Sequence, residues 1–93
     1  MRLVYLESAA RDIAWFRYHY RSVFPAGSDN ARANLKAIQS LLAANPYVGH
    51  RSDGRPDVRE FPVKKTPFTL IYRVTPDQIE ILRLWDSRQG SEY

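Results

Sequence analysis

The last third of the chain, residues 58–88, constrains the fold more than any other segment. It contains three short runs rich in β-branched and aromatic residues, VREFPV, FTLIYRV and QIEILRLWDSR, which is the composition of β-strands. The two connections, 64–67 and 75–77, each contain a Thr-Pro pair, which is typical of a turn. Each run also contains arginine, a residue that is rarely buried without a partner. We therefore predict a small sheet whose arginines lie on an open face or at strand ends and attract an anionic partner.

Two amphipathic helices are predicted upstream of these strands. After a brief strand candidate at 2–6, Ser8 can cap a helix whose apolar residues recur every three or four positions. Residues 25–27 end this helix, a second helix runs from about 28 to 45, and residues 46–57 are predicted to form a loop. The apolar stripes are Ile13, Phe16, Tyr20 and Phe24 in the first helix and Ala31, Leu35, Ile38 and Leu42 in the second.

The predicted order of elements is βααβββ, in a single α+β domain that covers residues 1–93. The paired helices must lay their apolar stripes on one face of a small, mostly antiparallel sheet. In the run 68–74, alternate residues form an apolar set that we expect to face the helices. In the run 78–86 neither parity is clearly the buried one, so we expect a β-bulge or a sheet that is apolar on both faces. The set expected to face the helices is Phe68, Leu70, Tyr72 and Val74.

Composition narrows the possible functions. The chain has no cysteine, which excludes disulfides and thiolate chemistry. No apolar run approaches the ~20 residues that span a membrane, and no signal-peptide pattern opens the sequence, so we expect a cytoplasmic protein. The net charge of +4 indicates an acidic partner. His19 and His50 stand apart from any cluster of ligands, so we expect no metal site and no cofactor, with His19 on a helix surface.

The same segments resemble a known family. The order βααβββ, together with NPYVGHR, VREFPV, FTLIYRV and IEILRLWDSRQ, resembles the RelE/ParE superfamily of bacterial toxins over nearly the whole chain. The resemblance implies the toxin of a type II toxin–antitoxin module. It also implies a hetero-oligomer with a cognate antitoxin, an acidic and partly disordered protein that covers the helical hairpin and a sheet edge. We expect Trp15, Tyr18 and Ile71 to contact this antitoxin.

RelE-like members of the superfamily cleave messenger RNA on the ribosome, and this chain carries only part of their residue set. Cleavage through a 2′-hydroxyl needs a base, a cation beside the phosphorane and an acid. The arginine expected early in the third strand is Thr69 here, and the lysines expected in the second strand correspond to Arg59 and Phe61, so an amine base is missing. If the chain is such an endoribonuclease, the resemblance assigns the chemistry to Arg59, Lys64, Arg73, Arg88 and Tyr93.

ParE-like members, which poison DNA gyrase, need no such set, and the resemblance favours this branch. The segments REFPV, FTLIYRV and EILRLW match it more closely, although Asp86 stands where many relatives carry a histidine. We expect growth inhibition through contacts with gyrase. A third possibility is a toxin-fold protein that has lost toxicity and binds only its antitoxin. The residues expected to contact the target are Arg59, Arg73, Arg83, Trp85 and Arg88, together with the tail to Tyr93.

Overall fold

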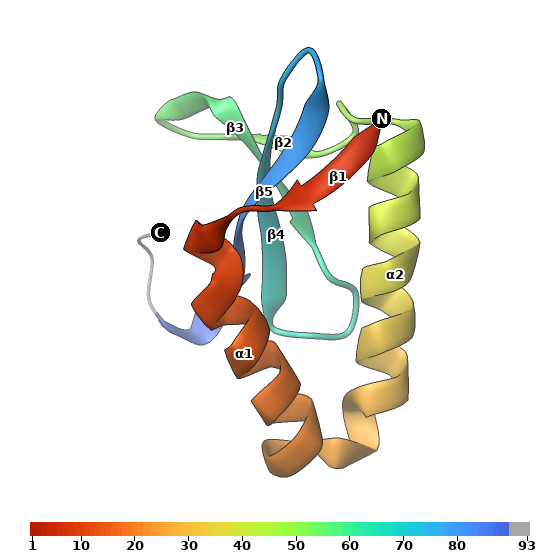
Figure 1. Cartoon of the computed structure of the whole chain (residues 1–93). Coiled ribbons are helices and arrows are strands. Elements are labelled where there is room, and N and C mark those ends of the chain that lie inside the picture. Colours follow the sequence, from red (N-terminus) through yellow and green to blue (C-terminus); the bar gives the residue numbers. More distant parts are fainter. Residues whose placement is uncertain (90–93) are drawn as a thin grey trace.

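A computed structural model describes residues 1–89, which form a five-stranded sheet with two helices packed on one face (Figure 1). The strand order is β1-β5-β4-β3-β2, in which β1 runs parallel to β5 and the other pairs are antiparallel. The predicted α+β fold with a helical hairpin after the first strand is confirmed. The elements are β1 (Arg2–Tyr5), α1 (Ala10–Tyr18), α2 (Ser28–Ala44), β2 (His50–Ser52), β3 (Arg55–Pro62), β4 (Phe68–Val74) and β5 (Gln78–Asp86).

The prediction that residues 46–57 form a loop is wrong in part. The segment contains β2 and the first residues of β3, which pair antiparallel around a turn where Gly54 has a φ of 78°. The register shifts between Arg51 and Ser52, so the pairing is irregular. Because β2 is an edge strand, its polar residues can face solvent, and the apolar alternation that reveals a buried strand is absent.

The first helix departs from its predicted stripe at its C-terminal end. A π-helical turn at His19–Val23 follows α1, closed by the Phe24 backbone N–H, which donates to the His19 carbonyl at 2.7 Å. A π-turn inserts one residue into the helical repeat and so rotates the later residues about the helix axis. Phe24 is therefore 52% exposed, and its prediction as a buried stripe residue is wrong. The same turn begins at His19, which is buried rather than on the helix surface as predicted.

The core lies between the helices and the covered face of the sheet. Phe68, Leu70 and Tyr72 of β4 belong to it and Val74 packs against it, which confirms the predicted alternation. The stripe of α2 also behaves as predicted, since its first, third and fourth members are buried and Leu35 packs against the core. Within residues 1–89 neither helix is long and apolar enough to cross a membrane.

A β-bulge in β5 resolves the ambiguous parity of that strand. Ile71 of β4 is opposite Arg83, but the next residue, Tyr72, is opposite Ile81, which leaves Leu82 as the extra residue. Ile81 faces the core before the bulge and Leu84 faces it after the bulge. Because of the inserted residue, odd-numbered residues of β5 are buried before the bulge and even-numbered ones after it. The predicted β-bulge is confirmed.

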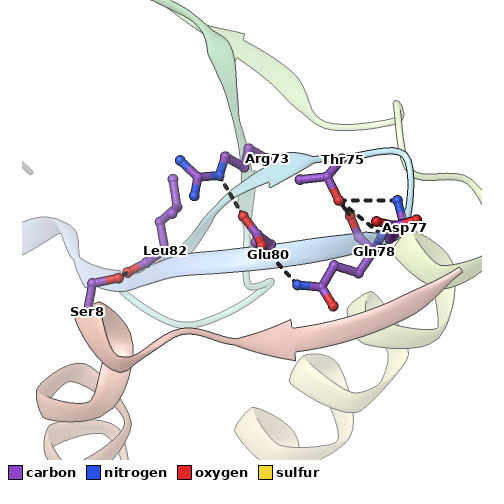
Figure 2. Close-up of polar contacts among 7 residues, drawn as sticks. All are labelled: Ser8, Arg73, Thr75, Asp77, Gln78, Glu80 and Leu82. Carbon is purple, nitrogen blue, oxygen red and sulfur yellow. Dashed lines mark hydrogen bonds and ion pairs between the residues drawn. The ribbon is translucent and has the colours of Figure 1, made fainter.

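The segment before α1 replaces β1 as the partner of β5 once β1 has ended. The Leu6 N–H donates to the Ile81 carbonyl at 3.0 Å, and the Ser8 hydroxyl donates to the Leu82 carbonyl at 2.7 Å (Figure 2). Further along, the Leu84 N–H donates to Oδ2 of Asp12 on α1 at 3.0 Å. Ser8 is therefore not the predicted helix cap, because its hydroxyl is used by the sheet edge.

Candidate functional site

Arg83 of β5 is fixed by a carboxylate and an aromatic ring. Its Nε and Nη2 donate to the two carboxylate oxygens of Asp12 at 2.6 and 3.0 Å, which is a bidentate pair. Its guanidinium carbon lies 4.9 Å from the centre of the Trp85 ring. Asp12 is 7% exposed and also accepts the Leu84 N–H, so one carboxylate neutralises Arg83 and completes the sheet edge.

Arg73 of β4 takes part in a chain of hydrogen bonds that crosses three strands. Its Nε donates to Glu80 at 2.7 Å, and the amide of Gln78 donates to the other oxygen of Glu80 at 2.8 Å (Figure 2). Arg2 of β1 donates in turn to Gln78 at 3.0 Å. The hydrogen bonds from Gln78 and Arg73 lower the pKa of Glu80. Arg73 alternates with core residues of β4, so these hydrogen bonds lie on the open face, which is the sheet face away from the helices.

Asp86, at the end of β5, is the centre of a third cluster. It is 3% exposed and accepts hydrogen bonds from Nε1 of Trp15 at 2.9 Å and from Nε and Nη2 of Arg88 at 2.9 and 2.8 Å. The hydrogen bonds from Arg88 outweigh the cost of burial and lower the pKa of Asp86 to about 2. Asp86 is therefore ionised at neutral pH, and it holds Arg88 while half of that side chain stays exposed.

His19 lies beside this cluster and is 4% exposed. Its ring packs against those of Trp15, Tyr20 and Phe68, with centroids 4.7 to 5.9 Å apart. Burial lowers the pKa of His19, and the charge of Arg88 lowers it further. The imidazole is thus a neutral packing residue at physiological pH.

Arg59 of β3 differs from the other arginines because neutral groups hold it. Its Nη1 donates to the carbonyls of Tyr47 and Gly49 at 3.1 and 2.8 Å, and its guanidinium carbon lies 5.2 Å from the centre of the Tyr47 ring. Arg59 is opposite Tyr72, a core residue, so it lies on the helix side of the sheet. A side chain at position 49 would meet the Tyr72 hydroxyl, which explains the glycine there.

The prediction that the strand arginines lie on an open sheet face or at strand ends holds for Arg73 and Arg88 but not for Arg59, and the fold itself supplies carboxylates to three of the arginines. Arg73, Arg83 and Arg88 each form an ion pair with a carboxylate, at 2.6 to 2.8 Å. Arg59 lies on the opposite side of the sheet, so the structure does not bring it together with Arg73 and Arg83. Of the remaining predicted nuclease residues, Lys64 is exposed in the β3–β4 connection and Tyr93 lies outside the described residues.

The residues predicted to contact an antitoxin fall into two groups. Trp15 and Tyr18 of α1 stack with ring centroids 5.7 Å apart; Trp15 is partly buried against the core, whereas Tyr18 is 46% exposed. Ile71 is 1% exposed, so it offers almost no apolar surface to a partner in the described chain. Ile71 and Val58 are buried apart from the main core, which shows that part of the open face is covered.

A groove between α1 and α2 was not predicted from the sequence. It has a volume of about 560 Å³ and an apolar floor, and three arginines line it. Arg17 and Arg21 are one helical turn apart at the end of the first helix, and Arg32 approaches from α2. This spacing on two antiparallel helices is the sequence signal that could have revealed the groove. The lining residues are Tyr5, Ile13, Phe16, Arg17, Arg21, Arg32, Leu35, Gln39 and Leu84.

The arrangement of two helices on a mostly antiparallel sheet defines the class of domain found in parDE toxin–antitoxin systems. A solved structure described as a chromosomal ParDE TA system from P. aeruginosa superposes with a TM-score of 0.66 and 28% identity, over 90% of this chain and 92% of that one. A family model described as the ParE toxin of the type II toxin–antitoxin system parDE matches residues 3–90. The chain therefore belongs to the ParE toxin family, within the RelE/ParE superfamily.

A relative with a similar name matches part of the chain. Toxin ParE3 of Caulobacter vibrioides is 42% identical over 64 residues, which make up 64% of this chain and 62% of the relative. The alignment thus spans less than two thirds of that protein's length.

Proposed function

We propose that this ParE toxin inhibits growth in the cytoplasm by binding DNA gyrase, through contacts rather than by its own bond cleavage. The observation that carries the proposal is the ion pairing of Arg73 and Arg88, two cations that a nuclease would need beside the scissile phosphate. Carboxylates that neutralise these cations would also repel a phosphate. Together with Thr69 and Phe61 at positions where basic residues are expected, the pairing supports a toxin without intrinsic catalysis.

The proposed gyrase contact includes the C-terminal half of β5. Arg83 and Trp85 stack there, and Arg88 follows with 53% of its side chain exposed. Aromatic and arginine side chains supply much of the binding energy in protein interfaces, and ion pairs that fix an arginine reduce the entropy it loses on binding. Arg73 extends this contact on the open face, and Arg59 remains a proposed contact on the other side.

We further propose that the groove between the helices receives the antitoxin. An acidic, partly disordered antitoxin could order an amphipathic segment there, with apolar residues on the floor and carboxylates beside Arg17, Arg21 and Arg32. None of these three arginines forms a salt bridge within residues 1–89, so the groove has cations available for a partner. Trp15 and Tyr18 would extend the contact along α1 in the resulting hetero-oligomer.

A ribosome-dependent endoribonuclease is the second candidate. Two observations favour it: Arg59 has no carboxylate partner among residues 1–89, and Lys64 is exposed. These two cations could contact an RNA phosphate.

Paired assays separate the two candidates. Purified toxin is expected to block supercoiling by gyrase and to raise the number of DNA breaks, while leaving messenger RNA intact in a translating extract. Arg88→Ala is expected to weaken the gyrase effect, and Arg11→Ala, which removes an exposed arginine that forms no salt bridge in the described chain, serves as the matched control. Cleavage of messenger RNA without an effect on gyrase would overturn the proposal. Activity in neither assay, with antitoxin binding retained, would indicate a non-toxic relative.

A further inference from the structure

The β2–β3 hairpin carries two neighbouring arginines that have no carboxylate partner. Arg51 of β2 is directly opposite Arg59 of β3. Residues opposed in this way point to the same face with Cβ atoms about 5 Å apart, and like charges in such a pair destabilise the sheet. Neither arginine takes part in a salt bridge within the part of the chain that the structure describes. The pair is therefore a local excess of positive charge that a bound anion would relieve.

Arg59 is held in a fixed direction without losing its charge. The two carbonyls that accept from its Nη1 are neutral, and the Tyr47 ring against its guanidinium is also neutral. Within residues 1–89 its Nε and Nη2 donate no hydrogen bond, which leaves a planar edge of the guanidinium available. That edge matches the two oxygens of a phosphate group. Arg59 is thus better suited to bind an anion than to stabilise the fold through an ion pair.

The surroundings of this pair favour a polyanion over a single carboxylate. Arg55 lies on the same hairpin and is exposed, as is Arg51. The hairpin therefore carries three arginines, one on β2 and two on β3. Asp53, Asp57 and Glu60 also lie on the hairpin, and within residues 1–89 neither Asp53 nor Asp57 forms an ion pair with these arginines. The Tyr47 ring is 63% exposed and offers a surface for stacking on a sugar or base.

We propose that the surface formed by Tyr47, Arg51, Arg55 and Arg59 binds the phosphodiester backbone of a nucleic acid without reading its sequence. Phosphate contacts from arginine give affinity but little sequence information. A short hairpin that carries a pair of opposed arginines, Arg51 and Arg59, would contact the backbone rather than enter a groove. The net charge of +4 adds a favourable long-range attraction.

The experiment measures binding of the purified full chain to a labelled duplex DNA of mixed sequence and to a single-stranded RNA, at several salt concentrations. Arg51→Gln is the principal variant, because the Arg51 side chain forms no salt bridge or hydrogen bond in the described chain, so its replacement should not disturb the fold. We expect each of Arg51→Gln and Arg59→Gln to weaken binding roughly tenfold, as for one charge-assisted hydrogen bond. Each should also lower the slope of log affinity against log salt by about 0.9.

Arg11→Gln is the matched control, since it removes one exposed positive charge from α1. A loss of affinity equal to that of Arg51→Gln would show that diffuse charge drives binding and would overturn the proposal. Unchanged binding by the Arg51→Gln, Arg59→Gln double variant would overturn it too. Displacement of the nucleic acid by polyglutamate at equal charge would instead identify the surface as a site for an acidic protein. Stronger binding in the DNA or the RNA arm identifies the source of the phosphodiester.

Discussion

The arginines of the sheet and the arginines of the helical groove differ in what they contact. Arg73 and Arg83 lie on adjacent strands and each meets a carboxylate, whereas Arg17, Arg21 and Arg32 line an apolar groove and form no salt bridge in the described chain. A strand position fixes its cross-strand neighbours closely, and the fold supplies a carboxylate to each of these two arginines, whereas Arg51 and Arg59 on β2 and β3 form no salt bridge in the described chain. A helix surface fixes its neighbours less closely. The difference teaches that Arg83, held by the buried Asp12, contributes to stability and that the groove arginines are available for binding.

The largest effect that tests this comparison is expected for Asp12→Ala. The change leaves Arg83 without its bidentate partner and the Leu84 N–H without an acceptor. Removing one partner of a mostly buried ion pair costs about 3 kcal/mol of unfolding free energy. Urea denaturation measures the loss. Arg17→Ala, on the same helix, should change the unfolding free energy by less than about 0.5 kcal/mol. Equal losses in the two variants would break the comparison.

Asp86 should make the free energy of unfolding depend on pH in the acidic range. Its pKa of about 2 lies below the usual 3.8, so the folded state gains stability when Asp86 is ionised, which is at pH values above its unfolded pKa. This contribution, about 2 kcal/mol, is lost as the pH falls from about 4 towards 2. Urea unfolding across this range should show Asp86→Asn less stable at pH 7 and nearly equal to the wild type at pH 2. A difference that stays constant with pH would contradict the assignment.

Charge reversal in the groove should affect binding and leave stability unchanged. Arg32→Glu is expected to lower affinity for the antitoxin about tenfold, because it places a negative charge against acidic residues of the partner. Titration calorimetry with the cognate antitoxin measures this change. Arg11→Glu, an equal change of charge outside the groove, controls for long-range electrostatics. If the two variants lose the same affinity, the antitoxin does not occupy the groove.

The smallest effect is expected for Arg73→Gln. Its ion pair with Glu80 lies near the surface, where solvent weakens such interactions. Urea unfolding of this variant should be indistinguishable from that of Arg11→Gln. A clear loss of stability would show that the chain of hydrogen bonds from Arg2 to Arg73 acts as a unit.

The sequence was sufficient for the features that depend on periodicity. Alternation in β4 and the three-to-four spacing in α2 identified the buried faces, because both patterns reflect the geometry of a single element. The mixed parity of β5 left two solutions, a bulge or a sheet apolar on both faces, and only the structure shows the bulge. β2 was missed, since a short polar edge strand has no apolar pattern to detect.

The polar clusters could not be predicted, because they depend on how distant elements meet. Asp12 and Arg83 are 71 residues apart, and so are Trp15 and Asp86. Only the packing of α1 against the edge of β5 brings them together. The burial of His19 likewise depends on its packing against Phe68 of β4, which is far away in the sequence.

The hydrogen bonds that α1 and the segment before it make to β5 have a consequence for the chain on its own. Ser8 and Asp12 occupy backbone groups that a strand of another molecule would otherwise use to extend the sheet. A newly made toxin that has not yet met its partner is thereby protected from joining edge to edge with its own copies along this border.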